Sequence, residues 1–452
     1  MKSRDKIICR ERKRGIALSF RGKDYDLTYP GGIWQAYPRK AKDFFIDNIT
    51  FAQTVSLPLV SGIKTLNYGT SAPALKPFFD SAVVKNIPAA VDGYKVSTAG
   101  TIRQFINTGY IFSNGRPRRP HFGGRMRKNR VIVSFSMGKD SMLTLAVCRE
   151  LGLEPVGVYI NDTVSPGENG LKIKYMKEIA LRLGVRIVVV TNETEQLNDF
   201  ENWSGEETCI GYVHMIPAFA FALLPVARYF RAGHIILGNE QNMNFPFFTG
   251  DGYRAYPSFD QSAEGTADLD GMIKLSTGGK VGVSSIIEPL SSIAIMKILH
   301  QRYKNFANYQ VSCDCLDTVR AGTRWCGRCR TCAKVYILLK ANGVNPADAG
   351  LKRNMLGRDC GKYFSLFNGS EIDGNDRSEW ARDEILLTFY MAYKKGARGW
   401  LIEKFKKRFL KEAGRREKEL RGKFLTAQGG ESIPPGFRKK VLSIYESELK
   451  KP

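Results

Sequence analysis

The stretch that most constrains the fold is a β-type run joined to a helix-type run by six residues, five of them small or polar. Residues 131–135 are rich in β-branched side chains, which is typical of a buried strand, and residues 136–141 follow without a gap. The segment that continues from residue 141 suits a helix. Main-chain N–H groups of such a turn converge on an anion, and the helix dipole favours negative charge there. The junction therefore predicts a phosphate-binding loop.

Downstream of this junction, apolar runs alternate with helix-type segments. Apolar runs occupy residues 156–160, 185–190 and 234–238, and helix-type spacing occupies residues 173–183 and the apolar stretch 216–230. Near-continuous apolar runs are typical of strands buried on both faces of a parallel sheet. We therefore expect an α/β domain with a doubly wound parallel sheet over residues 126–350. Its ligands should bind at the carboxyl ends of the strands.

Two further regions flank this domain. Residues 1–125 carry short mixed patterns, including strands expected at residues 25–29 and 54–60, and predict an accessory α+β domain. Residues 114–130 form a basic linker broken by proline and glycine, which could contact nucleic-acid phosphates or serve as a solvated connector. Residues 351–452 are rich in Lys and Arg at helical spacing, and predict a helical C-terminal region.

Charge and cysteine content bound the partners and the compartment. The formal net charge of +25 favours anionic partners such as nucleotides or nucleic acid, although it can also serve solubility alone. Five of the nine cysteines fall within residues 313–332, which indicates metal binding in a reducing compartment and hence a cytoplasmic location. The apolar stretch 216–230 is shorter than the ~20 residues of a membrane span, so we expect a buried core helix and no membrane contact.

The loop differs from two common nucleotide-binding motifs and resembles a third. Gly138 and Lys139 are followed by Asp140, which excludes a Walker A loop, and the turn has no G-x-G-x-x-G pattern. It resembles the pyrophosphatase loop, S-G-G-x-D-S, of the N-type ATP pyrophosphatases, where the loop follows the first strand of a HUP-type α/β domain. Met137 replaces the first glycine of that motif. We expect this position to tolerate a Cβ only with a negative φ and a side chain turned away from the phosphate.

The residue types of the loop suit a triphosphate and a metal. Ser136 and Ser141 can donate hydroxyl hydrogen bonds to phosphate oxygens, and Lys139 can neutralise phosphate charge. Asp140 is expected to act through Mg²⁺, which prefers carboxylate and phosphate oxygens. We therefore expect Lys139, Asp140 and Ser141 to be catalytic. The resemblance implies that ATP contacts Ser134, Ser136, Met137, Gly138, Lys139, Asp140 and Ser141.

Polar residues also follow two other expected strands. The second strand, after which the family binds adenosine, is followed by Tyr159, Asn161 and Asp162, and either of the last two could bond a ribose hydroxyl. The later strand is followed by Gly238, Asn239 and Glu240, which could face substrate or Mg²⁺. Each group could equally form a plain loop cap.

A second motif is a cluster of cysteines. Cys326, Cys329 and Cys332 form a tight knuckle, and either Cys313 or Cys315 could supply a fourth thiolate. Four thiolates suit a structural, tetrahedral Zn²⁺ site, with a disulfide or a redox pair as the alternatives. The spacing resembles that of the 7-cyano-7-deazaguanine synthases, in which a Ser-Cys precedes the knuckle, and this match favours Cys313. A second similar branch, the ATP-dependent epimerases of UDP-muramoyl-dipeptide glutamate, shares a tryptophan before the knuckle, here Trp325.

Both branches imply the same chemistry. ATP and Mg²⁺ bind the loop, a substrate carboxylate attacks the α-phosphorus, and pyrophosphate leaves. The expected function is therefore AMP-forming activation of a carboxylate-bearing small molecule. The alternatives are a tRNA-thiolating ATP pyrophosphatase, with tRNA favoured by the positive charge, and a non-catalytic nucleotide- or nucleic-acid-binding module. A homodimer is compatible with either enzyme.

Overall fold

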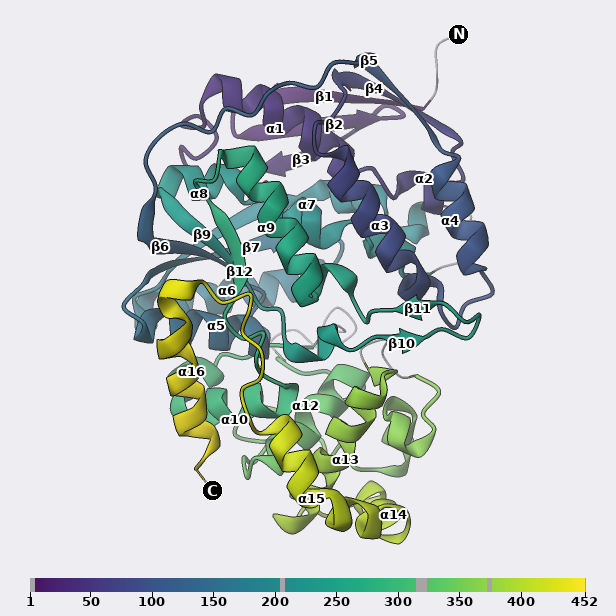
Figure 1. Ribbon diagram of the computed structural model, residues 1–452, viewed down its shortest axis with the longest axis vertical. Helices are drawn as coiled ribbons and strands as arrows, with labels where there is room; N and C mark the ends of the chain where they lie inside the picture. Colours follow the sequence, from purple (N-terminus) through teal and green to yellow (C-terminus); the bar gives the residue numbers. More distant parts are fainter. Residues whose placement is uncertain (1–4, 204–207, 314–322, 372–375, 452) are drawn as a thin grey trace.

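The computed structural model describes residues 5–203, 208–313, 323–371 and 376–451. Its framework is a ten-stranded sheet in the order β12-β9-β6-β7-β8-β3-β2-β1-β4-β5, with helices on both faces (Figure 1). The strands of this sheet are β1 (Lys6–Arg12), β2 (Gly15–Phe20), β3 (Lys23–Thr28), β4 (Thr65–Ser71), β5 (Gly109–Asn114), β6 (Arg127–Ser134), β7 (Glu154–Asn161), β8 (Arg186–Asn192), β9 (Ala232–Leu237) and β12 (Gly282–Ser285).

The helices divide between the faces of the sheet and a C-terminal layer (Figure 1). Those of the first half are α1 (Arg39–Ala52), α2 (Leu57–Ser61), α3 (Lys76–Val91), α4 (Thr98–Ile106), α5 (Lys139–Glu150), α6 (Pro166–Leu183), α7 (Met215–Ala222) and α8 (Leu224–Phe230). Those of the second half are α9 (Ala263–Thr277), α10 (Ser292–Arg302), α11 (Lys304–Ala307), α12 (Arg330–Ala341), α13 (Glu379–Lys394), α14 (Trp400–Arg408), α15 (Leu410–Phe424) and α16 (Pro435–Leu449).

Five of these strands form the parallel part, and the sequence predicts four of them: β6, β7, β8 and β9. β6 pairs in parallel with β7 on one side and with β9 on the other, and β8 and β12 extend the two sides. Along the chain, β7 and β8 follow β6 on one side of it, and β9 and β12 are then added on its other side. In open α/β sheets, the crevice where the strand order reverses is the usual ligand site. Here that crevice lies between the carboxyl ends of β6 and β9. The expected α/β class with a large, mostly parallel sheet is confirmed.

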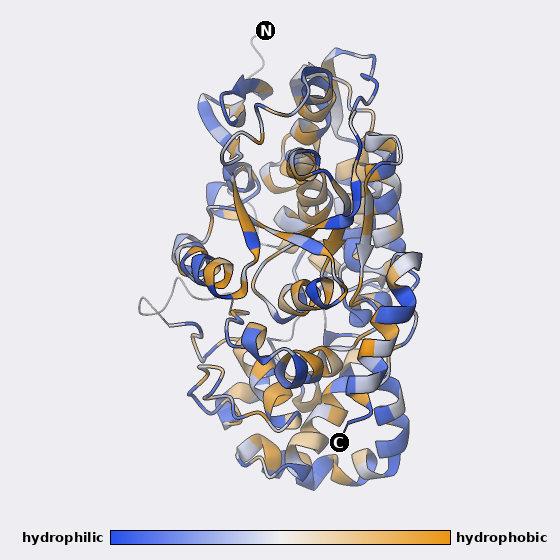
Figure 2. Cartoon of the chain, turned by 90° about the vertical axis from the view of Figure 1, so that its left-hand side faces the viewer, coloured by the Kyte–Doolittle hydropathy of each residue, from blue (hydrophilic) through white to orange (hydrophobic). Residues whose placement is uncertain are grey.

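Successive residues of β6 serve opposite faces of the sheet. Val131 and Val133 belong to one hydrophobic core, together with residues of α5, α10, α12 and α13. Ile132, between them, belongs to a second core with residues of α1, α3, α7 and α9. Because strand side chains alternate between faces, a continuous apolar run is what such a two-faced strand requires. Figure 2 shows hydrophobic residues concentrated on the central strands and hydrophilic residues on outward helical turns.

The N-terminal strands join the same sheet. β3 pairs antiparallel with β8, with Leu27 opposite Asn192, so the sheet runs through into residues 1–125. The strand expected at residues 25–29 is present as β3. The strand expected at residues 54–60 is wrong, because this segment turns into α2. Pro58 explains the difference: it lacks the N–H that a central strand needs, whereas the first turn of a helix leaves that group unpaired anyway.

The apolar stretch 216–230 is part of the core. It folds as α7 and α8, broken near Pro225, and Phe221, Leu224 and Val226 are fully or almost fully buried. By length and composition Cys209–Phe230 could cross a membrane, yet 72% of its most apolar window is buried inside the protein. This burial supports the expected core helix, since its apolar surface is already covered by the sheet and by α1.

The C-terminal residues are helical and pack against the α/β part. α13 lies along α12, and α16 returns to the sheet, where the Tyr445 hydroxyl donates to the Ile286 carbonyl at 3.0 Å (Figure 1). The basic linker crosses the other end of the molecule. Three of its cations already have internal partners: Arg118 pairs with Asp47, and Arg127 and Arg130 pair with Glu154. These ion pairs fit a connector and leave contact with nucleic acid untested.

Candidate functional site

The loop after β6 holds its shape through hydrogen bonds among its own residues. The Ser136 N–H donates to Ser141 Oγ at 3.2 Å, and the Ser141 hydroxyl donates to the Gly138 carbonyl at 3.2 Å. The Gly138 N–H lies 3.4 Å from Ser136 Oγ. Gly138 is the N-cap of α5, so the free N–H groups of the first helical turn face the crevice. Ser136 is exposed and Ser141 is buried, which makes Ser136 the more accessible hydroxyl.

Met137 departs from the expected backbone conformation. Its φ is +65°, in the left-handed region, so the expectation of a negative φ is wrong. This is the geometry that the first glycine of the resembling motif adopts freely, whereas a residue with a Cβ pays about 1–2 kcal/mol there. The Met137 side chain is fully buried in the core shared with α5 and α10. Its packing offsets the strain and turns the side chain away from the crevice.

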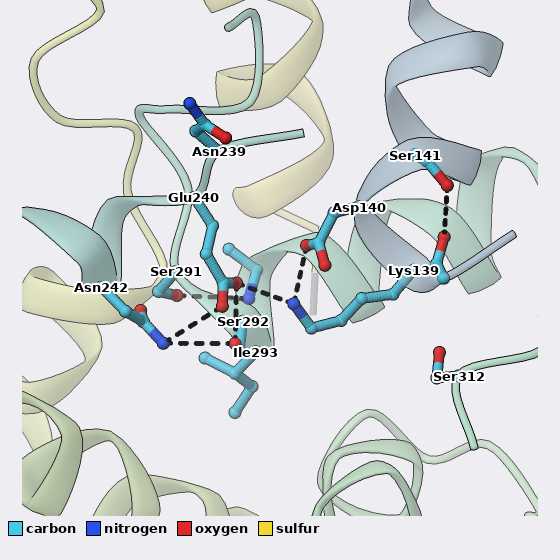
Figure 3. A network of polar contacts seen from close by, with 12 residues as sticks. Lys139, Asp140, Ser141, Asn239, Glu240, Asn242, Ser291, Ser292, Ile293 and Ser312 are labelled. Atoms are coloured by element: carbon cyan, nitrogen blue, oxygen red, sulfur yellow. Dashed lines mark hydrogen bonds and ion pairs between the residues drawn. The ribbon is translucent and has the colours of Figure 1, made fainter. Parts of the chain in front are cut away.

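The centre of the site is a lysine held between two carboxylates. Lys139 Nζ lies 2.6 Å from Asp140 Oδ1 and 2.8 Å from Glu240 Oε2 (Figure 3). Glu240 also accepts a hydrogen bond from the Ser292 hydroxyl at 2.8 Å, and Asn242 Nδ2 lies 3.4 Å from its other oxygen. These residues come from α5, from the segment after β9 and from the start of α10. The two strand ends thus meet as the parallel sheet predicts.

Burial and charge set the protonation of this cluster. Burial raises the pKa of Asp140 to about 6, against the opposing effect of Lys139. Burial disfavours the Lys139 cation, yet Asp140 and Glu240 together hold the pKa of Lys139 above its usual value. For Glu240, burial is outweighed by Lys139 and Lys334, and its pKa is lowered. At neutral pH the cluster is therefore two carboxylates sharing one ammonium.

A cavity of about 340 Å³ opens over this cluster. Its wall includes four cations, Lys139, Lys172, Arg330 and Lys334, and four carboxylates, Asp140, Glu168, Glu240 and Asp376. Several are paired: Lys334 lies 2.7 Å from Asp376, and Lys172 bonds Glu168 one helical turn before it. The cavity has the size and the convergent polar groups of a small-molecule site. Because the wall carries equal numbers of cationic and anionic side chains, it suits a ligand with several negative charges that binds together with a metal cation.

Five of these charged residues were missed from the sequence: Glu168, Lys172, Arg330, Lys334 and Asp376. The i, i+4 pairing of Glu168 and Lys172 was a signal that these two share a helix face. Nothing local could show that the face meets the loop. Lys334 and Asp376 lie far from it in sequence and reach the cavity only through the packing of α12 and α13.

The adenosine candidates are engaged in local structure. Asn161 accepts a hydrogen bond from the Thr163 N–H at 3.3 Å, and Asp162 accepts from the Val164 N–H at 3.2 Å. The buried Tyr159 hydroxyl donates to Asn169. None of the three lines the cavity. The Asn161 and Asp162 side chains therefore form the loop caps that the sequence left as an alternative. A role of these residues toward adenosine stays a prediction.

Of the candidates after β9 and at the end of β6, only some line the cavity. Glu240 lines the cavity, whereas Asn239 is buried and donates to Thr266 Oγ1 at 2.9 Å. Gly238 allows a close approach, because a Cβ there would lie 3.2 Å from the Cβ of Asp140. Ser134 ends β6 and does not line the cavity. Of these four residues, Glu240 is the one placed to contact a ligand.

The four predicted cysteines come together beside the cavity. The Sγ atoms of Cys313, Cys326, Cys329 and Cys332 all lie within 4.8 Å of one another and could hold a metal ion. Main-chain N–H groups point at three of the sulfurs, for example that of Cys332 at Cys329 Sγ over 3.3 Å. Such N–H donors favour thiolates. Cys315, the competing fourth ligand, lies outside the described residues.

The cysteine cluster also forms part of the cavity wall, because Cys313 lines it and Arg330 and Thr331 lie between two of the cysteines. A closed four-thiolate site leaves no open metal position, so it would act on the cavity by shaping its wall.

No protein-family model matches this chain, and a search of curated proteins finds no significant match.

Proposed function

We propose that this protein is an AMP-forming ATP pyrophosphatase that activates the carboxylate of a small-molecule acid. The observation that carries the proposal is the Lys139 bridge between Asp140 and Glu240, because it joins the loop after β6 to the segment after β9 at the reversal of the strand order. Two carboxylates and a lysine beside a helix N-terminus suit the handling of a triphosphate with its metal. The HUP-type assignment rests on this arrangement and on the resemblance of the loop.

The β- and γ-phosphates of ATP would lie on the loop. Free N–H groups at the start of α5 and the exposed Ser136 hydroxyl offer hydrogen bonds, and the α5 dipole favours the negative charge. Met137 leaves the crevice open because its side chain is buried on the other side. Lys139 and Lys334 add positive charge to the wall. These groups stabilise charge that grows on pyrophosphate as it leaves.

The donor set suits Mg²⁺. Asp140 and Glu240 converge on a single point of positive charge, now the Lys139 ammonium, and carboxylate oxygens are the ligands that Mg²⁺ prefers. Asp140 and Glu240 would hold the ion, which would supply charge neutralisation to the phosphates. Mg²⁺ would take the position of the Lys139 ammonium between the two carboxylates. The Lys139 side chain is long and flexible, and Lys139 belongs to the loop that would bind the phosphates. Lys139 would then contact phosphate oxygens as a point charge.

The reaction needs no general base in its first step, because the attacking carboxylate is already ionised. One of its oxygens bonds to the α-phosphorus, and the bond from that phosphorus to the bridging oxygen breaks. Pyrophosphate keeps the electron pair, and the acid becomes an acyl-adenylate. Attack of an amine on the activated carbonyl would then form an amide and release AMP. Alternatively, the carbon next to the carbonyl would lose and regain a proton, and attack of water on the carbonyl would then release AMP and the acid.

For the cysteine cluster we propose a structural Zn²⁺. The four sulfurs match the closed tetrahedral donor set that zinc prefers in such sites. Elemental analysis of the purified protein should give about one zinc per chain. Folded protein that is purified without metal and takes up no added Zn²⁺ would contradict this part of the proposal.

The activity is tested by product analysis. Wild-type protein, Mg²⁺ and ATP are incubated with a pool of biological carboxylic acids, and AMP, pyrophosphate and adenylated acids are measured by mass spectrometry. We expect AMP and pyrophosphate in equal amounts. Formation of ADP and phosphate, or ATP binding with no AMP under any condition, would exclude the proposal.

Two variants locate the activity at the bridge. Asp140→Asn and Glu240→Gln keep side-chain shape and remove one charge each, and should lower AMP formation by about 10²-fold or more. Glu379→Gln is the matched control, since Glu379 is exposed at the start of α13. Full activity of Asp140→Asn would show that the proposed metal ligand is wrong.

A further inference from the structure

A second cavity of about 320 Å³ adjoins the first. Arg330 lines both cavities, and Asp376 of the first is followed in the chain by Arg377 of the second. The two spaces are therefore divided by Arg330 and by the start of the segment that leads into α13. A molecule in the second cavity would have one end within reach of a nucleotide in the first.

The walls of this second cavity come from five separate parts of the chain: residues 86–94, residues 209–216, residues 257–261, Arg330 and Arg377. The end of α3 supplies Ala90 and the following turn Tyr94, and the 3₁₀ helix η3 (Cys209–Tyr212) supplies Cys209 and Tyr212. The C-terminal region supplies Arg377. Tyr94 and Cys209 meet across the wall, with the hydroxyl oxygen 3.6 Å from Sγ. The N-terminal part of the chain thus helps to build the second cavity, whereas none of its described residues lines the first.

The lining is amphipathic. Tyr94 and Tyr212 are large side chains left 42% and 56% exposed, and Met215 and Ile216 add apolar surface beside them. Exposed aromatic rings lining a cavity are suited to stacking on a flat or apolar ligand. Charged groups also line the cavity: the guanidinium groups of Arg330 and Arg377, which carry N–H donors for oxygen acceptors, and the carboxylates of Asp92 and Asp260.

Arg377 is held in place rather than free to swing. It forms an ion pair with the buried Asp92, and it packs over Gly93, where a Cβ would lie 3.0 Å from its Nη2. A guanidinium has five N–H donors, so the pair with Asp92 leaves others for a ligand. Positioning of this kind is what a site needs to orient a polar group.

From these contacts we infer that the second cavity binds the acid substrate. Its reacting carboxylate lies at Arg330 and faces the α-phosphate, its apolar or ring-shaped body lies against Tyr94 and Tyr212, and an acceptor group meets Arg377. This inference rests on the proposed function, and it gives the N-terminal region a role in substrate selection. The substrate class is a carboxylic acid with an apolar body and at least one further hydrogen-bond acceptor.

The cavity can be blocked without changing the nucleotide site. Cys209 is exposed, and it lines the second cavity but not the first. N-ethylmaleimide attached to its sulfur should therefore fill part of the second cavity. We expect the labelled protein to bind Mg·ATP as tightly as before and to lose most acid-dependent AMP formation. Cys209→Ser treated with the same reagent is the control, and should stay active.

A pair of tyrosine variants tests the stacking surface. Tyr212→Ala should raise the KM for the acid about tenfold and leave the KM for ATP within twofold. Tyr229→Ala is the control, since Tyr229 is also exposed but does not line the cavity. Equal effects of both variants, or an unchanged KM in Tyr212→Ala, would overturn the inference.

The outcomes separate the two proposals. If unlabelled protein makes AMP and the labelled protein makes as much, the substrate cavity is wrong and the activity stands. If unlabelled protein makes no AMP, the proposed function fails. In that case native mass spectrometry of protein mixed with the acid pool still decides the cavity: an acid retained by unlabelled and not by labelled protein supports it, and no retained acid overturns it.

Discussion

The main-chain N–H of Val311 donates a hydrogen bond to the carbonyl of Met137 over 2.9 Å. This bond ties the loop after β6 to the segment that enters the cysteine cluster two residues later, at Cys313. The loop and the cluster are separated by about 175 positions in sequence, yet they share one wall of the cavity. Metal binding and nucleotide binding should therefore be coupled.

Removal of the metal should weaken ATP binding. Cys329→Ser or exhaustive chelation releases the segment around Val311, and loss of its bond to the loop should lower ATP affinity about tenfold. Isothermal titration with Mg·ATP measures this. Cys209→Ser is the control, because Cys209 lies outside the cluster. Unchanged affinity in metal-free, folded protein would show that the two sites are independent.

Substitutions at Met137 should reverse the usual order of alanine and glycine. Both Met137→Ala and Met137→Gly lose a buried side chain and should destabilise the protein by about 2–5 kcal/mol. Alanine keeps the strain of a Cβ at a φ of +65°, whereas glycine removes it. Met137→Gly should therefore be the more stable of the two by about 1 kcal/mol in urea unfolding. A more stable alanine variant would contradict the left-handed conformation.

Loss of the bridging lysine should be costly to folding. Lys139→Met leaves the buried Glu240 unpaired beside Asp140, whose side chain is 30% exposed, and breaking a partly buried pair in this way should cost about 3 kcal/mol. Adding Glu240→Gln should recover part of that loss, because one of the unpaired charges is then gone. Urea unfolding at pH 8 measures both. Lys407→Met, at an exposed position of α14, should have little effect.

Glu384 should give a pH-dependent stability difference. Burial first, and then the charge of Glu240, raises the pKa of Glu384 to about 7, above its ordinary 4.5. The folded state thus holds this proton more tightly than the unfolded chain, so its contribution to stability is complete below pH 4.5 and is lost as the pH rises through 7. Glu384→Gln keeps an acceptor for the Ile293 N–H and removes the titration. Relative to wild type, the variant should gain up to about 3 kcal/mol between pH 4.5 and pH 8.

The measurement is the difference in unfolding free energy between Glu384→Gln and wild type across this range. Glu379→Gln, on the exposed side of the same helix, should show a flat difference. A flat profile for Glu384→Gln would mean that the buried carboxyl is ionised at all these pH values.

Features that depend on neighbouring residues were predictable. The β6–loop–α5 junction, the parallel strands and the cysteine knuckle all follow from spacing within about 20 residues. The segment at residues 54–60 misled because Val, Leu and Val suit a strand, while Pro58 and the surrounding packing favour α2. For Asn161 and Asp162 the sequence left two roles open, because short polar side chains at a strand end serve a loop cap as readily as a ligand.

The amino-acid sequence by itself determined the strand–turn–helix junction after β6, the parallel direction of the central strands and the clustered cysteines, because each is encoded in local periodicity or spacing. Only the tertiary structure decided that Glu240 and Lys139 share one bridge, that Lys334 and Asp376 enter the same cavity, and that α3 walls a second one. It also decided the φ of Met137, since the core that buries its side chain is assembled from helices far along the chain. Long-range packing chooses among conformations that local sequence leaves nearly equal in energy.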